Sequence, residues 1–465
     1  MNAVLLKELR QSVRNRYVLA AYVIFIVALL IVAGVKVSLS IRDSWDNPQS
    51  VFSAGNTLFL VIHGIFAALA CLFIPTYVLT RITRERWGTD LDLMYVTPMP
   101  PSALLIGKFC SAMALAGLLL SGALPFLALS YFIGGIDVLS IVMTVILTLE
   151  LVAILTLHAM VVAITPMPKI IHRVAQLGLV MFLVGTVQAW LAISSYACYE
   201  GYMSILGNGR SCVTLVELMA IGVSVAGLFY TAALAGFRSV NLDRMRPFRI
   251  LATVLFAAWG GIAALQSSLH MYMFFEEALK LWASVLMLFS AGMLVVGLSE
   301  RTDPGAYIQK RLPRSRIRQA LGFLFRTGQL NAVCWALLLL AAGLAISNAT
   351  LTAENASPMV RHTWRSIHVS ALNISGYALT MLALWHYALR FTRMPATALW
   401  WVTGVVMVLV SAVLGPMRAG GVSGIDSFVG YLFAQEQGVV LPLLYGWNAI
   451  TLLILLPAIF GFPKK

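Results

Sequence analysis

Residues 18–39, VLAAYVIFIVALLIVAGVKVSL, form an apolar run whose only charged side chain is Lys36. A helix of about 20 apolar residues is long enough to cross the hydrocarbon core of a bilayer. The run is too long for a signal-peptide core and no small-residue cleavage site follows it, so we interpret it as a retained span. Eleven similar runs follow, at about 57–80, 103–133, 137–165, 173–198, 213–237, 250–269, 281–299, 330–347, 368–390, 397–415 and 438–461. The sequence therefore predicts an all-α, polytopic integral membrane bundle of about twelve transmembrane helices.

The composition of the whole chain supports this class and excludes others. Of the 465 residues, 60% are hydrophobic and 11% are charged, whereas roughly a quarter of the residues of a soluble domain are charged. A soluble fold cannot bury that much apolar surface. Five cysteines are also too few for a scaffold held together by disulfides.

The basic residues predict the orientation of the bundle. With the N-terminus inside, 25 of the 32 Lys and Arg residues fall on the cytoplasmic side and seven on the other. Cytoplasmic loops of membrane proteins carry such an excess. We therefore expect both termini in the cytoplasm, and the net charge of +14 reflects topology and does not require a nucleic-acid partner.

Residues 1–17 have the pattern of a short amphipathic helix. Apolar side chains recur every four residues, and basic side chains cluster beside that stripe. The apolar positions are Leu5, Leu9 and Val13, and the basic ones are Lys7, Arg10 and Arg14. Such a helix lies in the membrane interface, with its cations near the lipid headgroups. The alternative is a basic N-terminus that only sets the topology.

The segment RITRERWGTDLDLMYVTPMPPSALLIGKF, residues 81–109, predicts a second amphipathic helix, on the cytoplasmic side. Gly88 interrupts the helix continuing from the second run, Thr89 is placed to cap a new one, and three prolines end it. The residues of this element are Glu85, Arg86, Trp87, Gly88, Thr89, Asp90, Leu91 and Met94. An amphipathic helix in the loop 81–102 is suited to dock into a groove on a soluble partner. The alternative is a surface helix that packs on headgroups.

The same segment resembles the first cytoplasmic loop of type-2 ABC exporter permeases. The matching residues, in order, are Glu85, Arg86, Gly88, Thr89, Thr97, Pro98, Gly107 and Lys108. The run Lys7-Glu8-Leu9-Arg10, with Arg14 and Arg16 after it, is similar to the entry of that family into its first span. The resemblance covers about residues 1–235. The chain departs from the family in having Asp90 and Asp92 in place of a glutamate, and in having twelve predicted spans where one family unit has six.

The resemblance implies the membrane subunit of an ATP-driven exporter in the bacterial cytoplasmic membrane. Its loop helix would couple to a separate ABC ATP-binding subunit, which carries ATP and Mg, so this chain would bind no cofactor and would not itself be an enzyme. It would work as a homodimer or with a second permease. The chain contains no G-x-x-x-x-G-K-[ST] string, so a phosphate-binding loop for ATP is not expected on it.

The predicted organisation has three parts. Residues 1–17 form the interfacial helix, residues 18–237 form the exporter-like six-span core with the coupling loop 81–102, and residues 238–465 add six spans. The last part is either a degenerate second half or a set of added helices. The basic segment Arg311–Arg326 precedes a span as residues 2–16 do, but basic loops also follow from topology alone.

Ionisable residues inside the predicted spans are candidates for a translocation path, because a charge in the bilayer costs at least about 2.5–3.5 kcal/mol. Glu150 and His158 are eight residues apart in one span, Glu217 lies near the outer end of another, and His63 and His386 lie in two more. The alternative is that neighbouring helices satisfy each of these groups by packing.

The remaining side chains favour no other chemistry strongly. Cys198 and Cys212 stand at the two ends of one outer loop and could pair in an oxidising compartment. The sequence contains no H-E-x-x-H or C-x-x-C string, so no metal site is expected. Two other functions stay open: a gradient-driven secondary transporter, with paired acidic residues near the midplane, and a polytopic membrane enzyme.

Overall fold

A computed structural model describes the following residues: 3–46, 51–87, 100–165, 169–201, 209–238, 243–269, 278–297, 300, 322–351, 368, 371–372, 374–384 and 437–459. These residues form helices and the turns that join them, with no strand among them. The chain divides into two compact units, Met1–Ser239 and Val240–Lys465. Each unit is described by itself.

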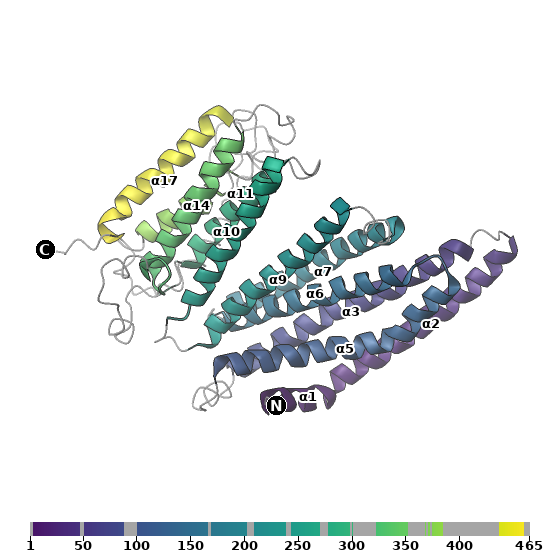
Figure 1. The fold of residues 1–465 in the computed structure, drawn as a ribbon. Coiled ribbons are helices and arrows are strands. Elements are labelled where there is room, and N and C mark those ends of the chain that lie inside the picture. Colours follow the sequence, from purple (N-terminus) through teal and green to yellow (C-terminus); the bar gives the residue numbers. More distant parts are fainter. Residues whose placement is uncertain are drawn as a thin grey trace, which may run out of the picture. The chain divides into compact units, whose positions relative to one another are not determined.

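Unit 1 is a bundle built around one long central helix (Figure 1). Its helices are α1 (Ala3–Val13), α2 (Arg16–Asp46), α3 (Val51–Trp87), α5 (Pro101–Ile133), α6 (Val138–Ile164), α7 (Lys169–Glu200) and α9 (Gly209–Phe237). The central helix α3 packs against α2, α5, α6 and α7. Figure 1 shows α1 set at an angle to α2, and α1 also packs on α5.

The core of unit 1 is apolar, and so is much of its outer surface. Phe59, Ile62 and Phe66 on α3 are fully buried. On α2, side chains such as Ile24 and Ile31 are more than half exposed. The outer side of a membrane-spanning helix contacts lipid tails. Because lipid tails are themselves apolar, apolar side chains are stable there.

Unit 2 contains α10 (Arg246–Leu269), α11 (Ala278–Gly297), α14 (Gln329–Leu351) and α17 (Gln437–Ile459). Helices α11 and α14 pack closely along their length. A Cβ at Gly297 would come within 2.8 Å of the Ala332 Cβ, and one at Gly343 within 2.8 Å of the Met287 Cγ. Small residues at these crossings let the two helices approach, as is common in membrane bundles.

Nine helices in the described part of the chain are long and apolar enough to cross a membrane, from Arg16–Leu39 to Gln329–Ala349. They coincide with the first nine predicted runs, so the prediction of an all-α, multi-pass membrane protein is confirmed. The runs at 368–390 and 438–461 are described in part, as the apolar segments Ile374–Leu384 and Leu444–Leu455. The run at 397–415 lies outside the described residues. The total of twelve spans and the cytoplasmic location of both termini stay predictions.

Candidate functional site

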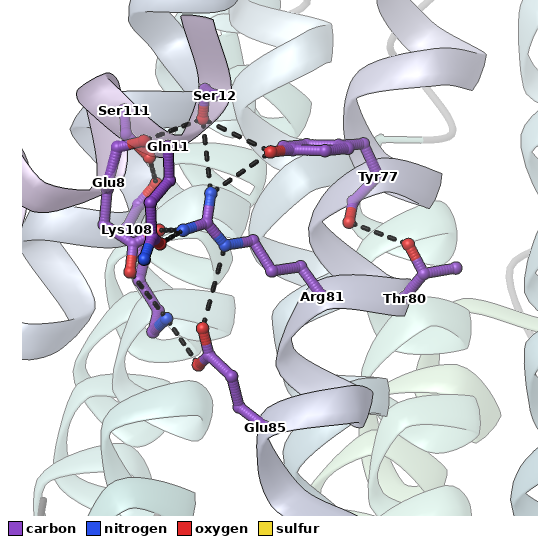
Figure 2. Close-up of polar contacts among 9 residues, drawn as sticks. All are labelled: Glu8, Gln11, Ser12, Tyr77, Thr80, Arg81, Glu85, Lys108 and Ser111. Carbon is purple, nitrogen blue, oxygen red and sulfur yellow. Dashed lines mark hydrogen bonds and ion pairs between the residues drawn. The ribbon is translucent and has the colours of Figure 1, made fainter. Parts of the chain in front are cut away.

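Four charged side chains meet at the end of unit 1 where residues 88–99 connect α3 to α5. Lys108 on α5 places its Nζ 2.6 Å from Glu85 Oε2 on α3 and 3.0 Å from Glu8 Oε1 on α1. Arg81, one turn before Glu85, reaches Glu8 Oε2 at 2.8 Å and Glu85 Oε1 at 3.7 Å. Figure 2 shows the resulting closed ring of alternating charges, the ion-pair cluster Glu8, Arg81, Glu85 and Lys108.

Two members of the ion-pair cluster are almost entirely buried. The side chains of Glu8 and Lys108 are 2% and 3% exposed, and those of Arg81 and Glu85 are each 17% exposed. Two carboxylates and two cations cancel one another, which is the condition for keeping ionised groups away from water. Removing one partner of a buried pair typically costs about 3–5 kcal/mol, because the other charge stays buried. The cluster therefore joins α1, α3 and α5 through charges that depend on one another.

The remaining N–H groups of Arg81 donate to hydroxyl and amide oxygens of neighbouring side chains. Its Nη1 donates to Ser12 Oγ at 3.2 Å and to Tyr77 OH at 3.1 Å, and its Nη2 donates to Gln11. Ser12 in turn donates to the Glu8 carbonyl at 2.9 Å. These contacts, drawn in Figure 2, hold the planar guanidinium in one orientation between α1 and α3.

The N-terminal helix α1 presents two polar side chains to the rest of unit 1. Glu8 and Ser12, one turn apart, are buried, whereas Val13 of the apolar stripe is 70% exposed. Lys7, Arg10 and Arg14 are exposed as well. Leu5 and Leu9 of the same stripe are half-buried, so the stripe faces outward only at its C-terminal end, and the contact of this helix with lipid stays a prediction.

The residues of the predicted coupling helix fall into two groups. Glu85, Arg86 and Trp87 belong to the last turn of α3 and not to a separate short helix. Gly88, Thr89, Asp90, Leu91 and Met94 lie outside the described residues. Arg86 donates to the carbonyl oxygens of Ala163, at 3.3 Å, and of Thr165, so it ties the end of α3 to the end of α6.

Sequence reasoning missed the ion-pair cluster although all four of its members stand in the quoted segments. Glu8 is an acidic residue in a basic segment, and Lys108 is a cation near the start of an apolar run. A charge inside a span is costly unless it is paired. This cost was a signal that Lys108, in the run 103–133, needs a partner, but it does not say which one.

The three acidic and histidine residues proposed for a path lie on α6 and α9. The Glu150 side chain packs against Gly222 of α9, where a Cβ would overlap its carboxyl group. His158 stacks on Phe229 of α9, with ring centroids 4.8 Å apart. Both residues of α6 therefore contact α9, as their spacing of eight predicts. Glu217 lies half-buried on α9.

A second buried polar group links α3, α6 and α7. Thr148 Oγ1 lies 2.9 Å from His63 Nε2 and accepts from Trp190 Nε1 at 3.0 Å, while it donates to the Thr144 carbonyl at 2.7 Å. A threonine hydroxyl has one hydrogen, so His63 must donate from Nε2. The Nε2 of His63 is therefore satisfied by a neighbouring helix, as the packing interpretation expects, whereas its Nδ1 is buried with no hydrogen-bond partner among the described residues. His386 lies outside the described residues.

Cys198 and Cys212 are free thiols in this structure. Cys198 is buried at the end of α7, and its Sγ lies 3.6 Å from Thr144 Oγ1. Their pairing under oxidising conditions stays a prediction.

Unit 2 has a buried cation of its own, at the start of α10. Arg249 is fully buried and donates to the Glu300 carboxylate and to the carbonyl oxygens of Leu324 and Arg326. Glu300 also accepts from the Gly328 backbone N–H at 2.7 Å. Burial raises the pKa of Glu300, and the adjacent Arg249 acts in the opposite direction. We call Arg249, Glu300, Leu324 and Arg326 the Arg249 clamp.

Comparison of the chain with models of protein families, with curated proteins and with solved structures finds no match. Among the residues that the structure describes, no three His, Cys, Asp or Glu side chains are grouped so that they could hold a metal ion.

Proposed function

We propose that this chain is the transmembrane permease subunit of an ATP-driven ABC export complex, which moves a substrate across the membrane with a separate ATP-binding subunit. The observation that carries the proposal is the 2.6 Å ion pair between Glu85 and Lys108. These residues lie on α3 and α5, on either side of the connection formed by residues 88–99. A force applied to that connection would reach both helices together, because the pair prevents them from moving apart.

The residues of the pair also belong to the motif that resembles exporter permeases. Glu85 opens the matching pattern and Lys108 closes it. The motif and the ion pair are separate observations, since the spacing of matching letters does not say which side chains touch. Their agreement on Glu85 and Lys108 supports the assignment of this end of unit 1 to a coupling role.

In the proposed mechanism, the partner ATPases close on ATP and Mg and push the segment 85–94. The ion-pair cluster passes the displacement to α1, α3 and α5. Because α3 packs against four other helices of unit 1, its displacement would move the bundle between inward-open and outward-open arrangements. This chain would contribute no catalytic residue to ATP hydrolysis.

One observation favours the second candidate, a gradient-driven transporter. The Glu150 side chain lies inside a span, and its Oε1 is buried with no hydrogen-bond partner among the described residues. A carboxyl group in that position could take up and release a coupling proton.

The experiment that tests the proposal is purification of the complex from its native membrane, followed by assays of ATP hydrolysis and transport after reconstitution. We expect an ATP-binding protein to copurify with the wild-type chain and with Leu91→Met. In Leu91→Asp, the copurified ATPase activity should fall by about thirtyfold, since the loss of a buried apolar anchor costs about 2 kcal/mol or more. Insertion should not change, because residue 91 is predicted to lie outside the bilayer.

Two outcomes would contradict the proposal. If Leu91→Asp retains the ATPase and transports at the wild-type rate, the 85–94 segment is not a coupling element. If transport by the wild-type chain requires a proton gradient and no ATP, and Glu150→Gln abolishes it, the chain is a secondary transporter.

A further inference from the structure

A cleft of about 740 Å³ lies beside the ion-pair cluster, between α1, the start of α2 and the second half of α3. This volume lies within the range of small-molecule sites, about 300–1,000 Å³. The side chains that give the cleft its chemistry are Lys7, Tyr17, Phe73, Tyr77, Arg81 and Arg84. The coupling mechanism proposed above assigns no role to this cleft.

The charge of the cleft is positive at one end. Lys7, Arg81 and Arg84 line it, with Glu85 as the one acidic side chain among the described lining residues. Arg81 is engaged by Glu8 and Glu85, but Lys7 and Arg84 are exposed and make no ion pair with any carboxylate that the structure describes. Cations left without an internal carboxylate, beside the hydroxyl of Tyr77, form a suitable environment for a phosphate group.

The other end of the cleft is aromatic. Phe73 and Tyr77 are stacked with ring centroids 5.9 Å apart, and Phe73 stands eleven residues before Arg84 on α3. This separation corresponds to about 16 Å along a helix. The lining therefore changes from cationic to apolar along the axis of a membrane-spanning helix, over a distance larger than a free phosphate needs.

Exposed apolar side chains lie next to the cleft, among the exposed basic residues Arg14 and Arg16, and they indicate the source of the phosphate. Tyr17, which lines the cleft, is 80% exposed, and Val13 and Leu19 close to it in the chain are 70% and 60% exposed. Exposed apolar groups around a cationic site are expected where the bilayer itself reaches the protein. A lipid can enter there with its headgroup at the cations and its acyl chains beside the aromatic rings.

We propose that this cleft binds one anionic phospholipid, with its phosphodiester at Lys7 and Arg84 and the start of its acyl chains against Phe73 and Tyr77. The bound lipid contacts both α1 and α3, so it holds the N-terminal helix in place. The proposal does not depend on a coupled ATPase.

The test is native mass spectrometry of the purified full-length chain after delipidation and titration with phosphatidylglycerol. The variant is Lys7→Gln/Arg84→Gln, and the matched control is Arg10→Gln/Arg14→Gln. The control removes the same charge from exposed positions on and just after α1 that do not line the cleft. Thr80→Trp, at a position that lines the cleft, fills it without a change of charge.

We expect the wild-type chain and the control to retain one phosphatidylglycerol. Lys7→Gln/Arg84→Gln should bind it about tenfold or more weakly, since each basic side chain near an anionic headgroup contributes about a factor of five. Thr80→Trp should weaken binding by a similar factor. Phosphatidylcholine, inorganic phosphate and glycerol 3-phosphate should compete poorly.

Three results would overturn the proposal. Equal losses in the variant and the control would mean a diffuse attraction to the whole basic surface. Effective competition by glycerol 3-phosphate or inorganic phosphate would mean a site for a soluble anion. Unchanged binding in both Lys7→Gln/Arg84→Gln and Thr80→Trp would place the lipid elsewhere. If the melting temperature of one of these variants is more than a few degrees below that of the wild type, lipid binding by the other variant is the test.

Discussion

The ion-pair cluster of unit 1 and the Arg249 clamp of unit 2 each stabilise a buried cation at the end of a membrane helix, but with different partners. In the cluster, Lys108 on α5 and Arg81 on α3 are neutralised by the side chains of Glu8 on α1 and Glu85 on α3. In the clamp, Arg249 contacts one carboxylate and two backbone carbonyls.

The difference concerns what can move. Side-chain pairs keep the helices together when one of them is displaced, because long side chains adjust their rotamers and the pairs stay formed. Contacts to backbone carbonyls of residues 324 and 326 hold the chain itself in one position. The cluster is therefore the better candidate for an element that transmits motion, and the clamp for one that fixes structure. Four substitutions test this contrast.

Arg249→Met should have the largest effect on stability. It leaves Glu300 buried without its cation and two carbonyl groups without a donor, which should lower the free energy of unfolding by about 3–5 kcal/mol. The measurement is the SDS-induced unfolding midpoint in mild detergent. Arg246→Met is the control, since Arg246 is exposed on the same helix turn, and should change stability by about 0.5 kcal/mol or less. Equal midpoints for the two variants would contradict the role of the clamp.

Lys108→Met should cost about 3 kcal/mol, because Glu8 and Glu85 would then share Arg81 alone. Glu8→Gln in addition removes the surplus negative charge, so the double variant should be more stable than the sum of the two single changes predicts. A double-mutant cycle should give a coupling energy of about 1–3 kcal/mol. Additive effects would show that the two charges act independently. In the proposed complex, Lys108→Met should also reduce transport, which Arg249→Met should affect only through stability.

Arg86→Met sharpens the contrast within unit 1, because Arg86 contacts backbone carbonyls as Arg249 does. Arg86 is only half-buried, so the lost hydrogen bonds should cost about 1–2 kcal/mol. Arg86→Lys retains the charge without the planar fork and should recover about half of that loss. If Arg86→Met costs as much as Arg249→Met, burial is not what separates the two sites.

Asp243→Ala should have the smallest effect. Asp243 accepts from the Thr327 backbone N–H at 2.6 Å and from its hydroxyl at 2.8 Å, next to the clamp. The loss of this half-buried acceptor should cost about 1 kcal/mol, measured by the same SDS titration. Asp243→Asn keeps one carbonyl oxygen as an acceptor and should be close to wild type in stability. A larger loss of stability in Asp243→Asn than in Asp243→Ala would contradict the role of Asp243 as an acceptor.

Much of the fold could be predicted because hydropathy is a local property. The runs at 18–39 and 137–165 are apolar enough to require a membrane whatever surrounds them, and helices α2 and α6 occupy them. The spacing of Glu150 and His158 placed both on the side of α6 that meets α9. The sequence also predicted that the helix of the second run continues to Gly88, and α3 ends at Trp87, with Glu85 and Arg86 in its last turn.

The sequence by itself determined that this is a membrane protein, where its spanning helices lie along the chain, and on which side its basic residues are expected. Only the tertiary structure decided which charges meet. Glu8 and Lys108 are 100 residues apart, and Arg249 lies 51 residues from Glu300. A buried charge requires a partner, but the partner is chosen by how the helices pack, and packing depends on side chains from several helices together.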